Sequence, residues 1–196
     1  MAIIFVASAS GFTYIMNGIT LTFNILYLIV GGIVGGYIGS KLTAMIKTKS
    51  LEKIFSVLLV IVSIRMFLNG NFESSFNENP FFYIIIGIVT GILSGLLGIG
   101  GGIVRIPLLI IFGGLENIVA QGFSLIATIP TAMTAAVTKL KGNPELIKQG
   151  TYIGLFGIIG SIIGGNAAFL MSQNVLNTVF AIFLLIVSFN LYLKKD

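Results

Sequence analysis

Seven apolar segments follow one another along the chain, separated by short polar stretches. They cover residues 3–16, 21–46, 51–68, 81–112, 118–137, 151–171 and 175–193. A helix needs about 20 apolar residues to cross a bilayer, and most of these segments reach or approach that length. Since an open backbone is not tolerated in lipid, apolar segments of this length indicate helices. The pattern predicts an all-α polytopic membrane protein with the lipid bilayer as its main partner.

The composition points to the same class. Charged residues are 9% of the 196-residue chain, against about 25% in soluble domains. So few charges do not cover a water-soluble body of this size, which excludes a soluble enzyme and a nucleic-acid-binding module. The chain also has no Cys and no His, so it carries no thiol nucleophile, no disulfide and no histidine metal ligand. We expect no catalytic residue, no metal and no cofactor.

The net charge of +5 indicates membrane orientation, because Lys and Arg gather in cytoplasmic loops. Lysines cluster at 41–53, at 139–148 and at the C-terminus, whereas the stretch 69–80 carries only two glutamates and no base. We therefore predict that the lysine-rich loops lie inside and that 69–80 lies outside, in a multi-pass protein of a bacterial or archaeal plasma membrane. With both of its ends then on the outer side, the segment 81–112 must enter the membrane and return.

An internal repeat relates two parts of the chain at an offset of 125 residues. The run VLLVIVS at 57–63 aligns with IFLLIVS at 182–188, and the same offset superimposes three glycines of each copy: Gly32 on Gly157, Gly35 on Gly160, Gly39 on Gly164. Residues 81–121 have no partner at this offset. We interpret 1–70 as an incomplete first membrane repeat, 71–80 as an extracytoplasmic linker and 81–196 as a complete second repeat. The first repeat then lacks its opening segment, either because the chain starts late or because its halves are unequal.

The segment 81–112 is too long for one straight helix. Its length as a helix would be about 48 Å, against a hydrocarbon core of about 30 Å. Four glycines between 98 and 102 interrupt it, and Pro107 suits the first turn of a new helix. We predict a broken, glycine-rich re-entrant segment, which gives each repeat an odd number of crossings. Two inverted helical repeats with discontinuous helices are typical of secondary transporters, whose substrate site lies near the midplane.

This segment contains two different glycine patterns. Gly87, Gly91 and Gly95 recur every fourth residue, as in a helix face that packs closely against another helix. The cluster at 98–102 is different, because glycines there permit positive φ angles and expose backbone amides. Amides facing outward at a helix N-terminus form an anion site. No Lys-Ser/Thr pair follows, so the motif is not a nucleotide-binding loop.

The stretch 91–109 resembles the sulfite exporter TauE/SafE family, also called the toluene sulfonate uptake permease family. Members open each repeat with a pattern similar to G-x-x-x-G-x-x-G-x-G-G-G, then a few apolar residues and Pro-x-Leu, here at 91–102 with Pro107 and Leu109. A Gly-Thr-Ser element follows in the family, and here Phe123 stands between Gly122 and Ser124. The first repeat's own glycine motif is absent. The resemblance implies permeation of small sulfur-containing or organic anions.

We predict that an oxyanion is held by the amides of 100–103, by Arg105 and by one face of 118–137. A charge at the bilayer centre costs at least about 2.5 kcal/mol, so Arg105 either contacts an anion or snorkels to an interface. The polar face either lines a pore or hydrogen-bonds to neighbouring helices. The predicted substrate-binding residues are Gly98, Gly100, Gly101, Gly102, Ile103, Arg105, Pro107, Gln121, Ser124, Thr128 and Thr131.

The leading functional hypothesis is a membrane permease or exporter for small anions such as sulfite or sulfonates. The alternative is a non-transporting membrane subunit, or a half-module completed by another chain or a second copy, and homo-oligomerisation stays open. An intramembrane enzyme is excluded, because the chain has neither an HExxH motif nor paired membrane aspartates nor a Ser–His pair.

Overall fold

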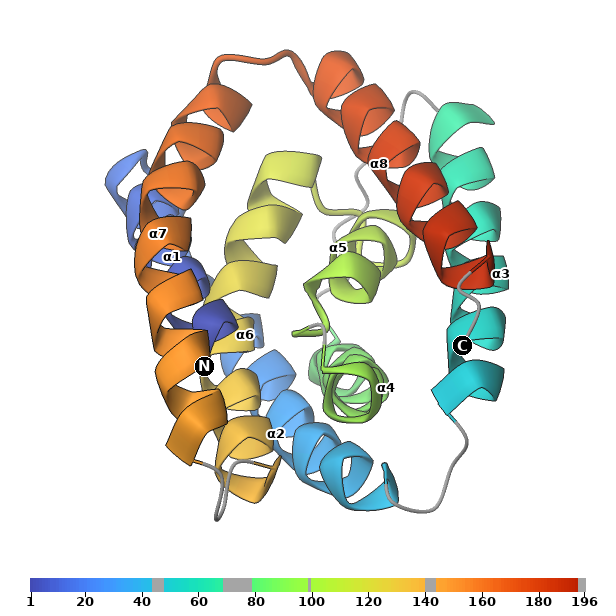
Figure 1. The fold of residues 1–196 in the computed structure, drawn as a ribbon. Helices are drawn as coiled ribbons and strands as arrows, with labels where there is room; N and C mark the ends of the chain where they lie inside the picture. Colours follow the sequence, from blue (N-terminus) through green and yellow to red (C-terminus); the bar gives the residue numbers. More distant parts are fainter. Residues whose placement is uncertain (44–47, 69–78, 99, 140–143, 194–196) are drawn as a thin grey trace.

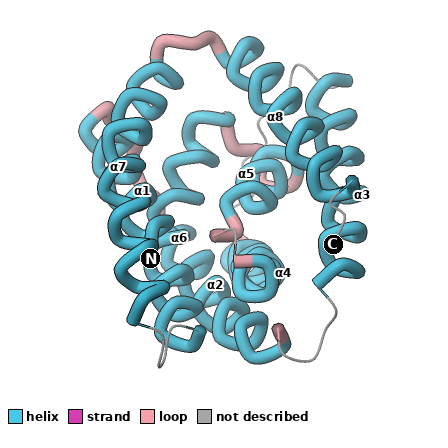
Figure 2. Tube along the Cα trace, in the orientation of Figure 1, coloured by secondary structure: helices cyan, strands magenta, loops and turns pink. Residues whose placement is uncertain are grey.

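The computed structural model describes residues 1–43, 48–68, 79–98, 100–139 and 144–193. Within these ranges the regular structure is entirely helical (Figures 1 and 2). The helices are α1 (Ala2–Met16), α2 (Asn24–Leu42), α3 (Thr48–Leu68), α4 (Pro80–Leu97), α5 (Gly102–Ile111), α6 (Asn117–Lys139), α7 (Pro144–Phe169) and α8 (Gln173–Leu193). The all-α prediction is confirmed. The predicted linker at 71–80 lies almost wholly outside the described residues.

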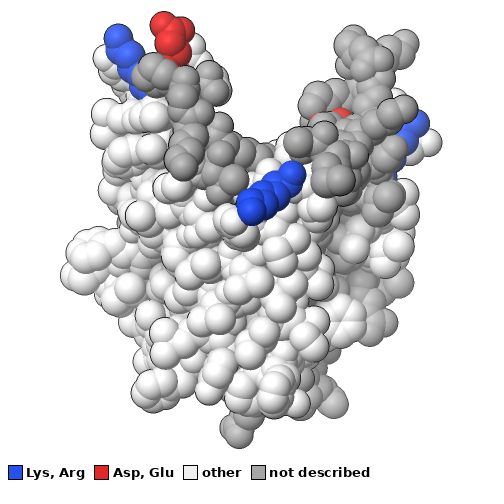
Figure 3. Space-filling model, turned by 90° about the horizontal axis from the view of Figure 1, so that it is seen from below, with Lys and Arg blue, Asp and Glu red and all other residues white. Residues whose placement is uncertain are grey.

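The helices are those of a multi-pass membrane protein. Five of them, α2, α4, α6, α7 and α8, are long and apolar enough to cross a membrane. Large apolar side chains are exposed on the outer helices, with Phe156 78% and Ile163 66% exposed. Figure 3 shows one face on which the charged side chains of the described residues gather toward one end, while the other described residues on that face are uncharged. An exposed apolar surface of this kind requires lipid around it.

The glycine-rich segment is broken, as predicted. Helix α4 ends at Leu97, and φ is +73° at Gly98, +77° at Gly100 and +73° at Gly101 before α5 begins. A Cβ built on Gly101 would lie 3.1 Å from Cβ of Ser94, while Arg105 reaches Thr90 one turn earlier on α4. The glycine turn therefore folds the start of α5 back against α4, and the return of the whole segment to one side of the membrane stays a prediction.

The predicted position of Pro107 is wrong. Pro107 lies inside α5, well past its first turn, and the helix begins at Gly102. Gly101 in its left-handed conformation serves as the N-cap, and its carbonyl accepts the first helical hydrogen bond, from the Arg105 amide at 3.0 Å. Because the glycine turn already reverses the chain, proline is not needed to start the new helix.

Helices α2 and α4 pack backbone against backbone through two glycine stripes. Gly31, Gly35 and Gly39 of α2 face Gly87, Gly91 and Gly95 of α4. A Cβ at Gly35 would lie 2.2 Å from the Ile88 carbonyl oxygen, and a Cβ at Gly91 would lie 2.5 Å from that of Gly32. No real side chain fits at such distances. The close-packing face predicted on α4 is confirmed, and α2 is its partner.

Helices α3 and α8 form a second pair, and both of their bounds differ by 125 residues. Ser63 donates to the Ala181 carbonyl at 2.8 Å, and Ser188 donates to the Ser56 carbonyl at 2.8 Å. Ser63 shifted by 125 residues is Ser188, and Ala181 shifted back by 125 is Ser56, so the repeat offset turns the first bond into the second. Ser63, later in α3, meets Ala181, earlier in α8, and Ser56, earlier in α3, meets Ser188, later in α8. The two helices are therefore antiparallel, as Figure 1 shows.

The same offset relates two further helix pairs. A Cβ at Gly32 of α2 would lie 2.5 Å from Thr131 Oγ1 of α6, and a Cβ at Gly157 of α7 would lie 2.6 Å from Val6 Cγ2 of α1. Gly157 lies 125 residues after Gly32, and Val6 lies 125 residues before Thr131, so the two contacts are equivalent in the repeat. The packing of α1 on α7 thus repeats that of α6 on α2.

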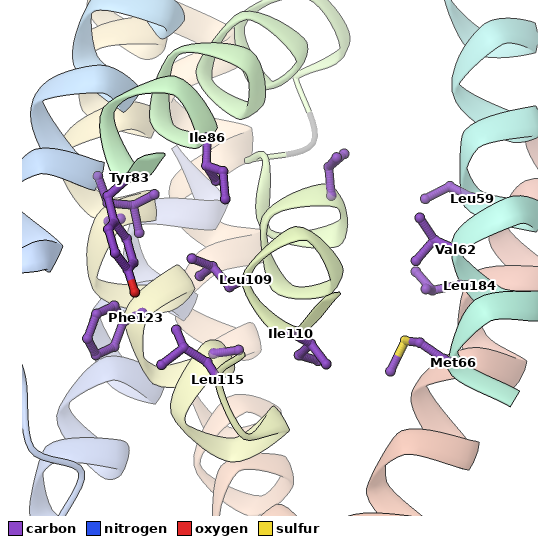
Figure 4. Packing of buried hydrophobic residues seen from close by; sticks show 14 of the residues in the cluster. Leu59, Val62, Met66, Tyr83, Ile86, Leu109, Ile110, Leu115, Phe123 and Leu184 are labelled. Atoms are coloured by element: carbon purple, nitrogen blue, oxygen red, sulfur yellow. The ribbon is translucent and has the colours of Figure 1, made fainter. Parts of the chain in front are cut away.

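A single buried apolar cluster joins α5 to its surroundings. Tyr83, Ile86 and Phe123 approach Leu109 from α4 and α6. In Figure 4 the side chains of Leu59, Val62, Met66 and Leu184, from the α3/α8 pair, point toward α5 from the other side. Helix α5 is therefore held on several sides, and its N-terminus is fixed against α4 and α6.

Candidate functional site

Arg105 lies at the centre of the candidate site, on the second turn of α5. Its side chain is 0% exposed. Nε donates to Thr90 Oγ1 at 3.1 Å, and Nη1 donates to the Ser124 carbonyl and to Thr128 Oγ1, each at 3.2 Å. All of these partners are neutral oxygens. A snorkelling arginine would expose its guanidinium, so that alternative does not describe Arg105.

One part of the guanidinium is left unpaired. Nη2 of Arg105 and Oγ of Ser124 are buried without a hydrogen-bond partner among the described residues. An unsatisfied buried polar atom costs about 1–3 kcal/mol, and more when it belongs to a charged group. Two such atoms on facing elements make this the candidate position for a polar ligand.

Glycines border the unpaired atoms. A Cβ on Gly32 or on Gly101 would lie 3.5 Å from Nη2 of Arg105, and a Cβ on Gly102 would lie 3.4 Å from Ser124 Oγ. A Cβ at Gly32 would also lie 2.5 Å from Thr131 Oγ1, and one at Gly101 would lie 2.9 Å from the Thr90 carbonyl oxygen. The glycines of α2 and of the turn therefore allow both elements to pack closely around the guanidinium.

The N-terminus of α5 opens beside the same atoms. Gly101, its N-cap, offers no side-chain hydrogen bond, and the first turn contains no acidic residue. The amides of 102–104 precede the first helical bond, which the Arg105 amide makes, so they have no acceptor within the helix. Such amides carry the positive end of the helix dipole. A buried cation and a helix N-terminus together favour an anion.

Thr128 ties the glycine turn to α6. Its hydroxyl donates to the Ser124 carbonyl at 2.7 Å, lies 3.2 Å from the Gly100 carbonyl oxygen, and accepts from Arg105 Nη1. The polar face predicted on α6 therefore meets the turn at Thr128. Other hydroxyls on this face bond within α6: Thr131 donates to the Ala127 carbonyl at 2.7 Å and also packs against Gly32.

Not all predicted residues converge on Arg105. Gln121 donates to Asn117 Oδ1 at 2.8 Å and accepts from the Tyr14 hydroxyl, and Asn117 donates to Asn177 at 2.6 Å. This polar chain joins α1, α6 and α8, and no contact brings Gln121 to the guanidinium. Ile103 and Pro107 pack in or against the apolar core, and Gly98 borders a cavity.

Sequence reasoning missed Thr90 and Gly32, both of which border Arg105. Thr90 is fully buried within the glycine stripe of α4. A single polar residue among these glycines is the sequence feature that could have identified it as a site residue. Gly32 was noted only as part of the repeat. Its role at the site depends on the way α2 crosses α6, which no local pattern encodes.

A small cavity reaches the glycine turn from the side of α1. It has a volume of about 140 Å³ and is lined by Met1, Ile3, Ser94, Gly98, Gly100, Ala132, Ala135 and Ala136. A Cβ at Gly100 would lie 2.9 Å from Ile3 Cγ2 and 3.4 Å from Thr128 Cγ2. The turn is thus enclosed by α1 and α6 and has free volume next to it.

The chain is similar to a known family of membrane proteins and to individual relatives. Residues 83–196 match the family model described as "Sulfite exporter TauE/SafE". The chain is 29% identical over 118 residues to "Probable membrane transporter protein YunE" of Bacillus subtilis (strain 168), covering 57% of this chain and 43% of that protein. It is 28% identical over 177 residues to a "Probable membrane transporter protein" of Xylella fastidiosa (strain 9a5c), covering 84% and 66%. The chain thus spans less than two thirds of either relative, and no solved structure matches it.

Proposed function

The chain belongs to the sulfite exporter TauE/SafE family, and on this premise we propose that it is a membrane permease for small anions, with sulfite or organic sulfonates as the substrate class. The relatives that it matches are named as membrane transporters, which supports transport. The family description supports a sulfur oxyanion.

The observation that carries the proposal is the unpaired Nη2 of Arg105 in a fully buried site. A buried charge without a counterion is strongly destabilising, by about 3–5 kcal/mol when a partner is removed from a pair. An oxyanion would supply that counterion. It would accept from Nη2 and from the Ser124 hydroxyl, and each charge-assisted bond is stronger than a neutral one.

The arrangement also suits release. Neutral oxygens hold Nε and Nη1, so the guanidinium keeps its place when the anion leaves. A carboxylate partner would instead neutralise Arg105 permanently and compete with the substrate. The alternative, a non-transporting subunit with a structural arginine, accounts for the three bonds but leaves Nη2 and Ser124 Oγ unexplained.

Transport is tested with the purified chain in vesicles loaded with sulfite, by measuring efflux. Arg105→Gln should reduce efflux about tenfold or more, because about 1.5–3 kcal/mol of charge-assisted bonding is lost. Lys41→Gln is the matched control, since the Lys41 ammonium lies over the Tyr37 ring, 4.4 Å from its centroid, on an exposed face. Equal efflux from the Arg105→Gln and native proteins would refute the site, and the absence of sulfite and sulfonate flux from the native chain would refute the function.

A further inference from the structure

We propose that the groove between α3 and α8 binds one anionic phospholipid, with an acyl chain along the groove and the headgroup at the end that carries Lys53. The proposal concerns the lipid that surrounds the chain, and it does not rest on the proposed transport function.

The groove is apolar along most of its length. It has a volume of about 660 Å³, and among the described residues only those of α3 and α8 line it. Figure 4 shows Leu59, Val62 and Leu184 pointing from these helices toward α5. The apolar side chains of the groove lie between these positions in the sequence and are partly or largely exposed: Val57, Val60, Ile61, Leu185, Ile186 and Phe189. A lining of this kind suits a hydrocarbon chain.

Two serines at the base of the groove do not make it polar. Ser188 donates to the Ser56 carbonyl at 2.8 Å, and Ser56 donates to the Lys53 carbonyl at 2.7 Å. Both serine side chains are buried. Their hydroxyls are therefore used within the helix pair, and the groove surface stays apolar between α3 and α8.

Polar side chains gather at one end of the groove. Because α3 and α8 are antiparallel, with Ser188 opposite Ser56, Lys53 comes level with Leu191, between Asn190 and Tyr192. Asn190 and Tyr192 line the groove, and Lys53 precedes Val57 by one turn on the same face of α3. All three side chains are exposed. This end of the groove therefore presents an amide, a phenol hydroxyl and an ammonium together.

These three groups match the polar part of a phospholipid. An amide that faces hydrocarbon without a hydrogen-bond partner costs free energy. The ester carbonyls of a lipid would accept from the Asn190 amide and from the Tyr192 hydroxyl, and tyrosine is typical of the boundary between hydrocarbon and headgroups. The Lys53 ammonium would bind the phosphate. An acyl chain entering from this end would lie directly in the apolar part of the groove.

The charge at this end favours an anionic headgroup. Lys53 is exposed, whereas the side chain of its neighbour Glu52 is 8% exposed. In the sequence, Lys194 and Lys195 follow α8, and Asp196 is the acidic residue after them. Basic sites between membrane helices on the lysine-rich side are typical positions for anionic headgroups. A zwitterionic headgroup would bring its own cation toward these lysines.

Charge also argues against a second copy of the chain as the occupant. Membrane dimers with two-fold symmetry about the membrane normal place the same end of each copy on the same side. Two copies joined through this groove would bring their Lys53 side chains toward each other, which is unfavourable. An anionic lipid would neutralise the same lysine.

Tryptophan fluorescence tests the site, since the native chain contains no tryptophan. Phe189→Trp places one in the groove, and Phe156→Trp, near the middle of α7 on an exposed face, is the matched control. Each variant is reconstituted in vesicles of phosphatidylcholine and phosphatidylglycerol, in which one lipid or the other carries brominated chains that quench a tryptophan on contact. We expect phosphatidylglycerol to be preferred about fivefold at Phe189→Trp, as one lysine near the headgroup implies. We expect no preference at Phe156→Trp.

The headgroup contact is tested in the Phe189→Trp chain. Lys53→Gln should remove most of the preference for phosphatidylglycerol, whereas Lys41→Gln, which removes an exposed lysine near the end of α2, should leave it unchanged. No preference at Phe189→Trp, an equal preference at Phe156→Trp, or a preference that persists with Lys53→Gln would each overturn the proposal. Weak quenching by both lipids at Phe189→Trp would also overturn it, because a protein surface such as a second copy would then cover the groove. None of these readouts depends on transport.

Discussion

Arg105 is held by hydroxyl and carbonyl oxygens and meets no carboxylate among its hydrogen-bond partners. In a low-dielectric interior a positive charge without a counterion is strongly destabilising, which is the basis of the proposed anion site. The position of the charge is nevertheless fixed, because three bonds orient the planar guanidinium. At the scale of one residue, the candidate site combines a cation held by three hydrogen bonds with the two N–H donors of Nη2, which have no partner among the described residues.

The glycines of the turn differ in what a side chain would meet. Gly98 and Gly101 both have φ of +73°, but a Cβ at Gly98 meets nothing within 4 Å, whereas one at Gly101 would lie 2.9 Å from the Thr90 carbonyl oxygen. Gly98→Ala should therefore cost only the backbone strain of about 1–2 kcal/mol. Gly101→Ala should cost more, because the turn must move away from α4.

Thermal unfolding of the two variants in detergent measures this difference. We expect a clearly lower Tm for Gly101→Ala than for Gly98→Ala, and loss of anion binding only in the former. Equal Tm values would show that the contact between the turn and Thr90 does not hold the site together.

At the scale of elements, the glycine stripes decide which helices meet. The break at 98–102 and the close-packing face of α4 were predictable, since both are local patterns with a direct physical meaning. The placement of Pro107 in the first turn of the new helix was wrong, because Gly101 already provides the N-cap from which α5 begins at Gly102. The partner of α4 was not predictable, because Gly35 and Gly39 were explained by the repeat and no local pattern pairs them with α4.

Substitution of the equivalent glycines Gly35 and Gly160 distinguishes the packed face of α2 from the open face of α7. Gly35→Leu should destabilise the chain strongly, by several kcal/mol, because α2 and α4 must separate. Gly160→Leu should change the unfolding temperature of the isolated chain by little, since its Cβ faces open space. Thermal unfolding of both variants in the same detergent provides the comparison. Similar destabilisation by the two substitutions would mean that α7 is already packed in the chain.

At the scale of the whole molecule, α3 and α8 are antiparallel and linked by exchanged hydrogen bonds. If both cross the membrane, equivalent segments face opposite sides, as the distribution of lysines predicts. Ser172→Cys, in the turn between α7 and α8, should react with an impermeant thiol reagent added outside. Glu145→Cys, at the start of α7, should react only after the membrane is opened. The reverse labelling would contradict the predicted orientation.

Most of the architecture could be foreseen because lipid allows few choices. Apolar segment length, lysine placement and the repeat are properties of the sequence alone. The site was foreseen in part: Arg105, Ser124, Thr128 and the glycine turn do converge, whereas Gln121 bonds to Asn117 and Tyr14. Helical spacing put Gln121 on the same face, but it could not show that the face is shared between a site and an interhelical polar chain.

The central claim is that Arg105 and Ser124 bind an oxyanion. The most direct measurement is the equilibrium affinity of the purified chain for sulfite and for methanesulfonate, by calorimetry, in the native protein and in Arg105→Gln. The account predicts binding of these anions by the native chain and an affinity at least about tenfold lower in the variant, as the loss of a charge-assisted bond requires. Equal affinities in the two proteins, or no binding of either anion by the native chain, would contradict it.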